Sequence, residues 1–270
     1  MSTGYKINHA KDNAAGYSIA NMWETQLGSL DVAADNAATG SDMLTSAEQS
    51  YSLLSDHLQR IRDLTEQAAN GTYGSDSLKA IASEITARLE EIDRISANCE
   101  FNGLKMMDGS LTDDINLQVG LYSDAASRIA LDASLFQNGH VSALFKTFGG
   151  VGGATVAEVA KLCSGYDGKQ ITGGQNEMLN KIDAVISEIS ARTTTLGAAQ
   201  NRIESAVESI NVQSENITSS LSTLRDADVA EESSNYIKAQ ILQQASATLL
   251  ATANQTPSIA LNLSLIHISE

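Results

Sequence analysis

Residues 176–225 carry an unbroken seven-residue repeat of branched aliphatic side chains. Its successive positions are Ile182, Ile189, Leu196, Ile203, Ile210, Ile217 and Leu224. This spacing places the side chains on one stripe of a helix and is typical of coiled-coil packing. A helix of this length is about 75 Å long, whereas a compact ball of the same chain length is about 45 Å across. We therefore expect an elongated, mainly α-helical rod.

The first half of the chain has matching apolar stripes. Two seams with seven-residue spacing are formed by Leu44, Tyr51 and Leu58, and by Ala47, Leu54, Ile61 and Ala68. This helix should end near Asn70-Gly71, a natural C-terminal break, and a second should begin between Ser75 and Ser77. The second would carry Leu78, Ile85, Ile92 and Cys99 on one side. Three long amphipathic helices are enough for a bundle.

Residues 103–133 change to a period of two. Apolar side chains alternate at Ile115, Leu117, Val119 and Leu121, and again at Ile129 and Leu131. Together with the turn signal Asp108-Gly109, this pattern predicts a small β-hairpin or meander.

Residues 134–174 hold nine of the 19 glycines of the chain. We expect a short, loosely ordered and variable insert, with one short helix at residues 155–162. The run FGGVGGATVAEV in it matches neither nucleotide-loop pattern and is better explained as a flexible linker.

The C-terminal region lacks charge. Residues 239–269 contain no Asp, Glu, Lys or Arg, although the whole chain has a net charge of −16. A surface helix normally carries charged residues, so this one should pack against copies of itself or against a partner. It is too polar to span a bilayer. The predicted assembly residues are Ile237, Ile241, Leu242, Leu249 and Leu250 on this helix, together with the repeat positions from Ile182 to Ile217.

The composition excludes several classes of function. The acidic balance argues against binding to nucleic acid and to anionic membrane surfaces. The two cysteines, Cys99 and Cys163, form no disulfide framework, and we expect reduced, structurally incidental thiols. The four histidines are scattered without ligand spacing. We expect no catalytic residues, no metal site and no cofactor.

Several runs resemble the bacterial flagellin family. They are STGYKINHAKDNAAGYSIAN at residues 2–21, LQRIRDLTEQAANGT at 58–72, RLEEIDRISANCEFNGLKMMDG at 88–109, INLQVG at 115–120 and SNYIKAQILQQASATLLATANQTP at 234–257. The runs occur in the family's order around a variable middle.

The resemblance implies a subunit of the flagellar filament. In flagellins the two termini pair as helices in the inner wall of the tube, the rod helices form the next shell and the middle segment faces outward. It also implies the partners of such a subunit, which are copies of itself, an export chaperone and a cap protein. The expected location is the bacterial flagellum, outside the cell, after export through the flagellar type III apparatus.

The resemblance divides the chain into six parts. We expect an N-terminal segment leading into the first long helix at residues 1–41, and the N-terminal part of the rod at 42–133. The outer insert would follow at 134–174, the C-terminal rod helix at 175–225 and the terminal assembly helix at 226–262. The ending LSLIHISE at 263–270 does not resemble the family, and we expect it to be a non-native tail.

The start of the chain also departs from the family. Flagellins begin with an amphipathic helix upstream of the opening block, and this chain starts inside that block. We therefore expect an N-terminally truncated chain in which the helix at 237–254 lacks its usual partner.

The resemblance further implies a site for the flagellin-sensing toll-like receptor. It would consist of Arg60 and Leu64 on the LQRxRxL helix and Glu91 on the next helix. The alternative interpretation is an ordinary solvated helix face with Leu64 in the bundle seam. Thr65 and Glu66 replace a small and a β-branched residue of the usual run, and the charge of Glu66 would weaken docking.

Three other functions compete with the filament subunit. A hook–filament junction protein shares the terminal helices. An enzyme in the outer insert is disfavoured, because residues 134–174 carry no metal motif. A truncated flagellin that does not assemble and acts only as a receptor ligand is the third.

Overall fold

The structure is a computed structural model that describes residues 3–146, 155–166 and 175–267, without the side chains of residue 176 and residues 255–267. Two compact units are present. The central unit comprises residues 28–214, and the terminal unit comprises residues 1–27 and 215–270. The predicted fold class is confirmed, since long helices dominate and the sheets are small and antiparallel.

Four long helices account for most of the chain. They are α1 (Ala14–Ala69), α2 (Ser75–Asn98), α5 (Gln175–Arg225) and α6 (Val229–His267). The predicted break at Asn70-Gly71, the start of the second helix at Ser75 and the continuous helix over the seven-residue repeat are all confirmed.

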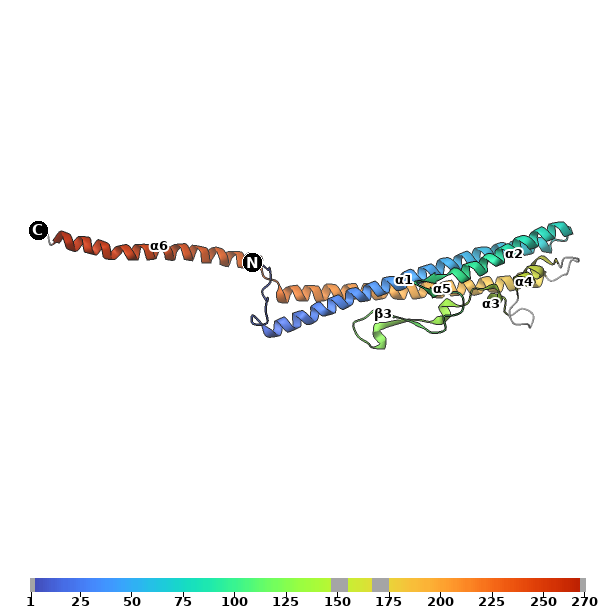
Figure 1. The fold of residues 1–270 in the computed structure, drawn as a ribbon, viewed down its shortest axis with the longest axis horizontal. Helices are drawn as coiled ribbons and strands as arrows, with labels where there is room; N and C mark the ends of the chain where they lie inside the picture. The colour runs from blue at the N-terminus through green and yellow to red at the C-terminus, as the bar shows by residue number, and fades with distance from the viewer. Residues whose placement is uncertain (1–2, 147–154, 167–174, 268–270) are drawn as a thin grey trace. The chain divides into compact units, whose positions relative to one another are not determined.

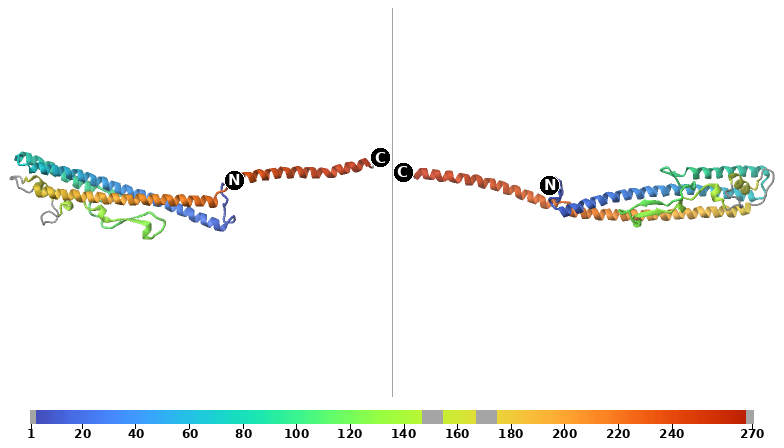
Figure 2. Two further views of the ribbon diagram at one scale, coloured as in Figure 1. Left: turned by 180° about the vertical axis from the view of Figure 1, so that it is seen from behind. Right: turned by 60° about the horizontal axis from the view of Figure 1, so that its bottom comes forward.

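The core of the central unit lies between α1, α2 and the first part of α5, which run side by side in all views (Figures 1 and 2). Fully buried side chains on these helices include Tyr51, Leu54, Leu58, Ile85, Leu89, Ile182 and Leu196. Burying each aliphatic side chain of this size contributes roughly 1.5–3 kcal/mol. Because residues 175–214 alone make a helix of about 60 Å, this unit is elongated, as expected of a rod.

In the part of the chain that the structure describes, two small antiparallel sheets lie beside the helices. Strands β3 (Ile115–Gln118) and β4 (Arg128–Leu131) pair in the register Ile115↔Leu131 and Leu117↔Ile129, so the predicted hairpin is confirmed. Strand β3 ends at Gln118, so the alternating residues Val119 and Leu121 lie outside the paired strand. A second hairpin of β1 (Glu100–Phe101) and β2 (Leu104–Lys105) was not predicted, although its turn is an Asn-Gly dipeptide.

The expectation of a loosely ordered insert is wrong for its described residues. After the 3₁₀ helices η1 (Ala125–Ser127) and η2 (Ala133–Phe136), the chain forms α3 (Val141–Leu144) and α4 (Val156–Ser164). The side chains that these segments bury in the common core are Leu135, Phe136, Val141, Leu144, Phe145, Val159, Ala160 and Cys163. Their helical spacing gives each short helix one apolar face, and that face covers the bundle. Residues 147–154 and 167–174 lie outside the described residues.

The short helix predicted at residues 155–162 is confirmed as α4, two residues longer at its C-terminal end. Its N-terminus has a complete capping box, in which the Thr155 hydroxyl accepts from the Glu158 amide and the Glu158 carboxylate accepts from the Thr155 amide. Its C-terminus ends at Gly165, whose positive φ of 63° suits glycine. These two caps fix the length of the helix.

Tyr51 attaches the insert to α1. Its phenol oxygen lies 3.2 Å from the carbonyl oxygens of both Leu135 and Gln137, and the guanidinium of Arg192 lies 5.9 Å from the centre of its ring. Burial is the main cause that raises the pKa of this phenol above its usual value. A neutral tyrosine therefore holds the segment after η2 against the bundle.

Candidate assembly site

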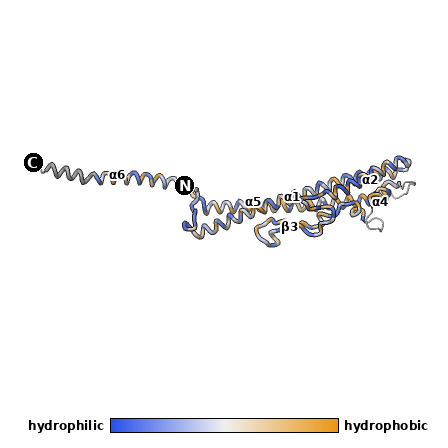
Figure 3. The backbone as a smooth tube through the Cα atoms, viewed as in Figure 1, coloured by the Kyte–Doolittle hydropathy of each residue, from blue (hydrophilic) through white to orange (hydrophobic). Residues whose placement is uncertain are grey.

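In the described part of helix α6, the large apolar side chains are exposed. Ile237, Ile241, Leu242, Leu249 and Leu250 are between 54% and 69% exposed. At about 100° per residue, these positions cover more than half of the circumference of the helix. Figure 3 shows apolar positions interspersed along the described part of α6. A helix that is apolar on several sides is normally surrounded by other protein, so α6 presents a surface suited to association.

The repeat residues of α5 lie elsewhere. Ile182, Ile189, Leu196, Ile203 and Ile210 are at most 5% exposed, in the central unit. Ile217 belongs to the terminal unit and is half-buried. The first five side chains therefore hold the central bundle of the chain itself together, and the exposed assembly candidates are those of α6.

Helices α5 and α6 are separated by a three-residue break at Asp226–Asp228, within the terminal unit. The Asp228 carboxylate accepts hydrogen bonds from the amides of Ala230 and Glu231, at 2.8 and 3.1 Å, and so caps the start of α6. The Ser222 hydroxyl donates to the Asp226 carboxylate at the end of α5. These contacts place the end of α5 and the start of α6 at specific residues.

The N-terminal segment is bound to this break. The amide of Lys6 donates to the carbonyl of Arg225 at 2.6 Å, and the amide of Ala227 donates to the carbonyl of Gly4 at 2.9 Å. The Arg225 side chain forms an ion pair with Glu24 of α1 and lies 4.1 Å from the centre of the Tyr5 ring. The opening residues of the chain thus stabilise the point at which α6 begins.

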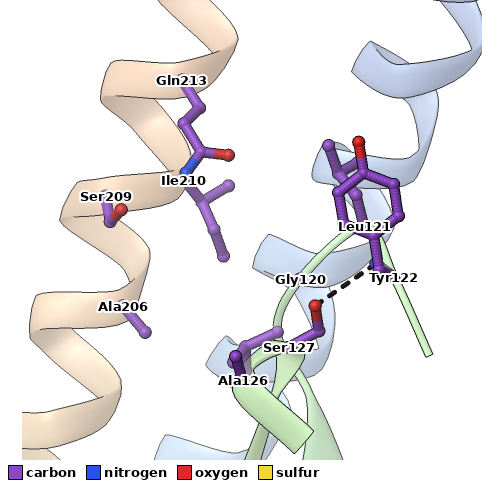
Figure 4. A pocket seen from close by; sticks show the side chains of 10 residues that line it. Gly120, Leu121, Tyr122, Ala126, Ser127, Ala206, Ser209, Ile210 and Gln213 are labelled. Atoms are coloured by element: carbon purple, nitrogen blue, oxygen red, sulfur yellow. Dashed lines mark hydrogen bonds between the residues drawn. The ribbon is translucent and has the colours of Figure 1, made fainter. Parts of the chain in front are cut away.

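A shallow cavity in the central unit lies between the β3–β4 connection and α5 (Figure 4). It has a volume of about 250 Å³ and is lined by Val119, Gly120, Leu121, Tyr122, Ala126, Ser127, Ala206, Ser209, Ile210 and Gln213. The lining residues include no carboxylate, imidazole, amine or thiol. These residues alone therefore supply neither an acid–base pair nor a metal ligand set.

The three residues predicted to bind the receptor occupy different environments. Arg60 is half exposed on α1 and forms an ion pair with Glu84 of α2 at 3.1 Å. Glu91 pairs with Arg94, one turn further along its own helix. Leu64 is only 2% exposed and belongs to the core, as the alternative interpretation expected. Glu66 pairs with Arg62 at 3.3 Å.

Glu84, the carboxylate that pairs with Arg60, is not among the residues that the sequence predicts for this site. Burial raises the pKa of Glu84, but hydrogen bonds from Arg88 and Arg60 outweigh that effect, so its pKa lies below its usual value. The side chain is therefore ionised at neutral pH. Finding this pair requires the relative alignment of α1 and α2, and the sequence pattern of either helix does not provide it.

The two thiols are buried and free, with Cys99 6% and Cys163 0% exposed. Burial raises the pKa of the Cys163 thiol to about 12. Because the thiolate is the reactive form, this side chain is chemically inert in the folded chain.

Comparisons with known proteins identify the family. Residues 1–112 match the sequence model of the bacterial flagellin N-terminal helical region, and residues 179–263 match that of the C-terminal helical region. The flagellin of Bacillus subtilis (strain 168) is 33% identical over 281 residues, which cover 97% of this chain and 90% of the relative. The chain belongs to the bacterial flagellin family. The flagellar filament 33 kDa core protein of Treponema phagedenis is 30% identical, and the match covers 89% of its length.

Solved structures of lower identity share the flagellin-like fold. A putative flagellar hook-associated protein from Vibrio parahaemolyticus superposes with a TM-score of 0.66 over 80% of this chain and 100% of that one, at 14% identity. FlgL of Bacillus cereus superposes with a TM-score of 0.57 over 74% of this chain and 99% of that one, at 18% identity. At these identities, the similarity shows a shared fold and no more.

The bacterial flagellin family is a family of structural proteins. Two further observations concern the described residues alone. No helix in them is both long and apolar enough to cross a membrane. No cluster of three or more His, Cys, Asp or Glu side chains in them could hold a metal ion.

Proposed function

We propose that this chain is a structural subunit of a bacterial flagellar filament, and that it polymerises through α6 and the bundle helices to support motility. The observation that carries the proposal is the exposed apolar surface of the described part of α6 after Lys238, where the helix carries no charged residue, in a member of the flagellin family. Exposed side chains such as Leu249 and Leu250 would lose their contact with water when copies associate, and burying each contributes roughly 1.5–3 kcal/mol.

The distribution of charge along the chain also supports a role of α6 in assembly. Of the residues that follow Lys238, only Glu270 is charged, so all but one unit of the net charge of −16 lies on the rest of the chain. Charged surfaces of the same sign on neighbouring copies repel each other. Little charge repulsion opposes contacts between uncharged helix surfaces. We place α6 inside the assembly and the charged faces of α1 and α2 toward solvent.

The test is elongation of filament seeds by the purified chain, followed by light scattering and electron microscopy. The double variant Leu249→Ser/Leu250→Ser should remain monomeric with unchanged circular dichroism, because both side chains are exposed in the single chain. The matched control Gln243→Ser/Gln244→Ser changes the same helix without removing apolar surface, and should elongate seeds normally. A wild-type chain that leaves seeds unextended, or a Leu variant that extends them as fast as the control, contradicts the proposal.

The same experiment separates a filament subunit from a hook–filament junction protein. A junction protein adds a limited layer, whereas a filament subunit continues to elongate. The hook-associated structure superposes at 14% identity, so it supports the shared fold, and the relatives at 30–33% identity include flagellins and a filament core protein. Those relatives favour the filament.

The remaining partners and the location are proposed from family membership. They are an export chaperone, a cap protein, and a place in the extracellular flagellum reached through the flagellar type III apparatus. Co-purification of the chaperone from the cell of origin and detection of the chain in sheared flagella are the direct tests.

We also propose the α1–α2 face around Arg60 as the surface for the flagellin-sensing toll-like receptor. The ion pair of Arg60 with Glu84 supports this surface, since both side chains are more than one-third exposed. Exposed arginines are frequent energetic centres of protein interfaces. Leu64, at 2% exposure, would support the helix from inside.

Receptor signalling measured as a dose response tests this surface. Arg60→Ala should shift the response to higher concentration, and Glu84→Gln should shift it more than Glu91→Gln, because Glu84 adjoins Arg60. An unchanged response to Arg60→Ala removes Arg60 from the site. A larger effect of Glu91→Gln than of Glu84→Gln would restore the residue set expected from the sequence.

A further inference from the structure

The sequence contains three Asn-Gly dipeptides, at Asn70-Gly71, Asn102-Gly103 and Asn138-Gly139. An asparagine before glycine can react with its own backbone, because glycine has no side chain to obstruct the approach and its backbone is unusually free. The three sites share this local chemistry. The folded structure holds each of them differently.

The reaction uses water and no other reagent. The glycine amide nitrogen attacks the Asn Cγ, the Cγ–Nδ2 bond breaks, and ammonia leaves with the proton from the glycine amide, so that a five-membered succinimide remains. Water then opens one of the two ring C–N bonds and gives aspartate or isoaspartate. No electrons are transferred.

Asn138-Gly139 is held in a form that cannot react. The Gly139 amide donates to the Met107 carbonyl at 2.9 Å, so the attacking nitrogen is engaged. The glycine is also packed tightly, since a Cβ placed on it would lie 2.6 Å from the Ser96 Oγ. The Asn138 Oδ1 accepts from the His140 amide at 2.8 Å. Attack at this site requires local unfolding.

Asn102-Gly103 is the two-residue turn between β1 and β2. Phe101 pairs directly with Leu104 on either side of it, and the Met106 amide donates to the Cys99 carbonyl at 2.9 Å. Both turn residues have positive φ, 49° for Asn102 and 80° for Gly103. The hairpin restrains the backbone rotation that ring closure requires.

Asn70-Gly71 is the least restrained of the three. It lies in the exposed connection between α1 and α2, at one end of the bundle (Figure 1). The Thr72 amide donates to the Asn70 Oδ1 at 3.3 Å, which polarises the Cγ carbonyl, as the corresponding bond does at Asn138. Among the described residues, no atom outside Gly71 and its two chain neighbours lies within 4 Å of a Cβ placed on Gly71.

We infer that Asn70 is the principal deamidation site of the folded chain, where the turn between α1 and α2 converts to aspartate and isoaspartate. The comparison with Asn138 carries the inference, because both Asn side chains accept the same type of hydrogen bond and differ in whether the following glycine is held. The product adds a carboxylate one residue beyond the C-terminus of α1. Negative charge there opposes the helix dipole, so the last turn of α1 is destabilised.

The test follows the folded full chain at mildly alkaline pH, with peptide mapping by mass spectrometry and isoaspartate quantified by enzymatic carboxyl methylation. Asn70 should convert first, and Asn138 at least about tenfold more slowly, because its reaction waits for local opening. In denaturant the three rates should come within a few-fold of one another. The inference is overturned if Asn138 or Asn102 converts as fast as Asn70 in the folded chain. It is also overturned if the same ranking persists in denaturant, since the peptide sequence would then be the cause.

Gly71→Ala gives a matched check at the site itself. Gly71 has ordinary negative-φ geometry and open space, so alanine fits without strain and the chain should keep its fold. The added methyl group obstructs the attacking nitrogen, so conversion at Asn70 should fall at least several-fold, while the rates at Asn102 and Asn138 stay unchanged. An unchanged rate at Asn70 would overturn the mechanism.

Discussion

The guanidinium carbon of Arg225 lies 4.1 Å from the centre of the Tyr5 ring, a contact that joins residues more than 200 positions apart in the sequence. The same arginine pairs with Glu24, and its carbonyl accepts from the Lys6 amide. The last residue of α5 thereby contacts both the N-terminal segment and α1. The break before α6 depends on this set of contacts.

Arg225→Ala should loosen the N-terminal segment. A cation–π contact contributes about 0.5–1 kcal/mol, so amide exchange at Lys6 and Ala227 should accelerate a few-fold. Hydrogen exchange with mass spectrometry measures both amides, whose partners are backbone carbonyls that the substitution leaves in place. Arg202→Ala, on an exposed position of α5, is the control and should leave them unchanged. Equal exchange in the two variants would show that the Arg225 side chain contributes nothing here.

Two glycines of α1 should respond to alanine with opposite signs. At Gly40 a Cβ would lie 2.3 Å from the Leu117 Cδ1 and within 3.3 Å of two further atoms of the same side chain, so the Leu117 side chain must move from its place against α1. Overpacking of this kind costs roughly 1–3 kcal/mol, against roughly 1 kcal/mol gained in helix propensity. Gly40→Ala should therefore lower the free energy of unfolding.

Gly28→Ala is the matched substitution. Among the described residues, nothing lies within 4 Å of a Cβ at Gly28, so only the helix propensity changes. The variant should gain roughly 0.4–1 kcal/mol. Urea unfolding of both variants is the measurement, and stabilisation by both would mean that Gly40 does not need the space.

The buried thiol of Cys163 predicts a loss of stability in alkali. Its pKa is about 12 in the folded chain, raised by burial from an ordinary value of 9.0. Between these values the unfolded chain releases the thiol proton while the folded chain keeps it. The folded state then binds more protons, so the free energy of unfolding falls as pH rises above about 9, by an amount of order a few kcal/mol at most.

Cys163→Ala removes this titration. Its unfolding free energy should be lower at neutral pH, because a buried group is lost, but should decline less steeply from pH 9 upward. Urea unfolding across that range gives the two slopes. Parallel slopes for the variant and the wild-type chain would assign the alkaline loss to other groups, such as the buried phenol of Tyr51.

Helix α6 should exchange its amides rapidly in the single chain. Between residues 237 and 254 its large apolar side chains are exposed, so little packing opposes local opening. Assembly should slow the exchange strongly over the same residues. Hydrogen exchange of the free chain and of filaments compares the two states, and strong protection in the free chain would contradict the assignment of α6 as the assembly helix.

The helix boundaries were predictable because they are local. Helix α1 ends at Ala69, directly before the break signal Asn70-Gly71. Helix α2 begins at Ser75 and carries an apolar stripe with the same seven-residue spacing as that of α5. The alternation that pairs Ile115 with Leu131 is also local. Each of these signals depends only on residues that are close together in the sequence and on how side chains repeat along a helix or a strand.

The contacts of the insert were not predictable in this way. Its glycines suggested a loose linker, yet Phe136, Val141 and Phe145 are buried. Whether a short apolar face is exposed or covered depends on another element with a complementary face, here the bundle that Tyr51 and Arg192 connect to the insert. The pairing of Arg60 with Glu84 likewise depends on the register between α1 and α2.

The sequence by itself determined the long helices, their apolar stripes, the charge-free C-terminal region and the family, because period, composition and family motifs are properties of the chain alone. Only the tertiary structure decided that the repeat from Ile182 to Ile210 is buried within the bundle of one chain, while Ile241 and Leu249 of α6 stay exposed. The physical reason is that an apolar stripe specifies burial without specifying its partner. The three helices of the central unit bury their apolar stripes against one another, whereas the described apolar side chains of α6 remain exposed.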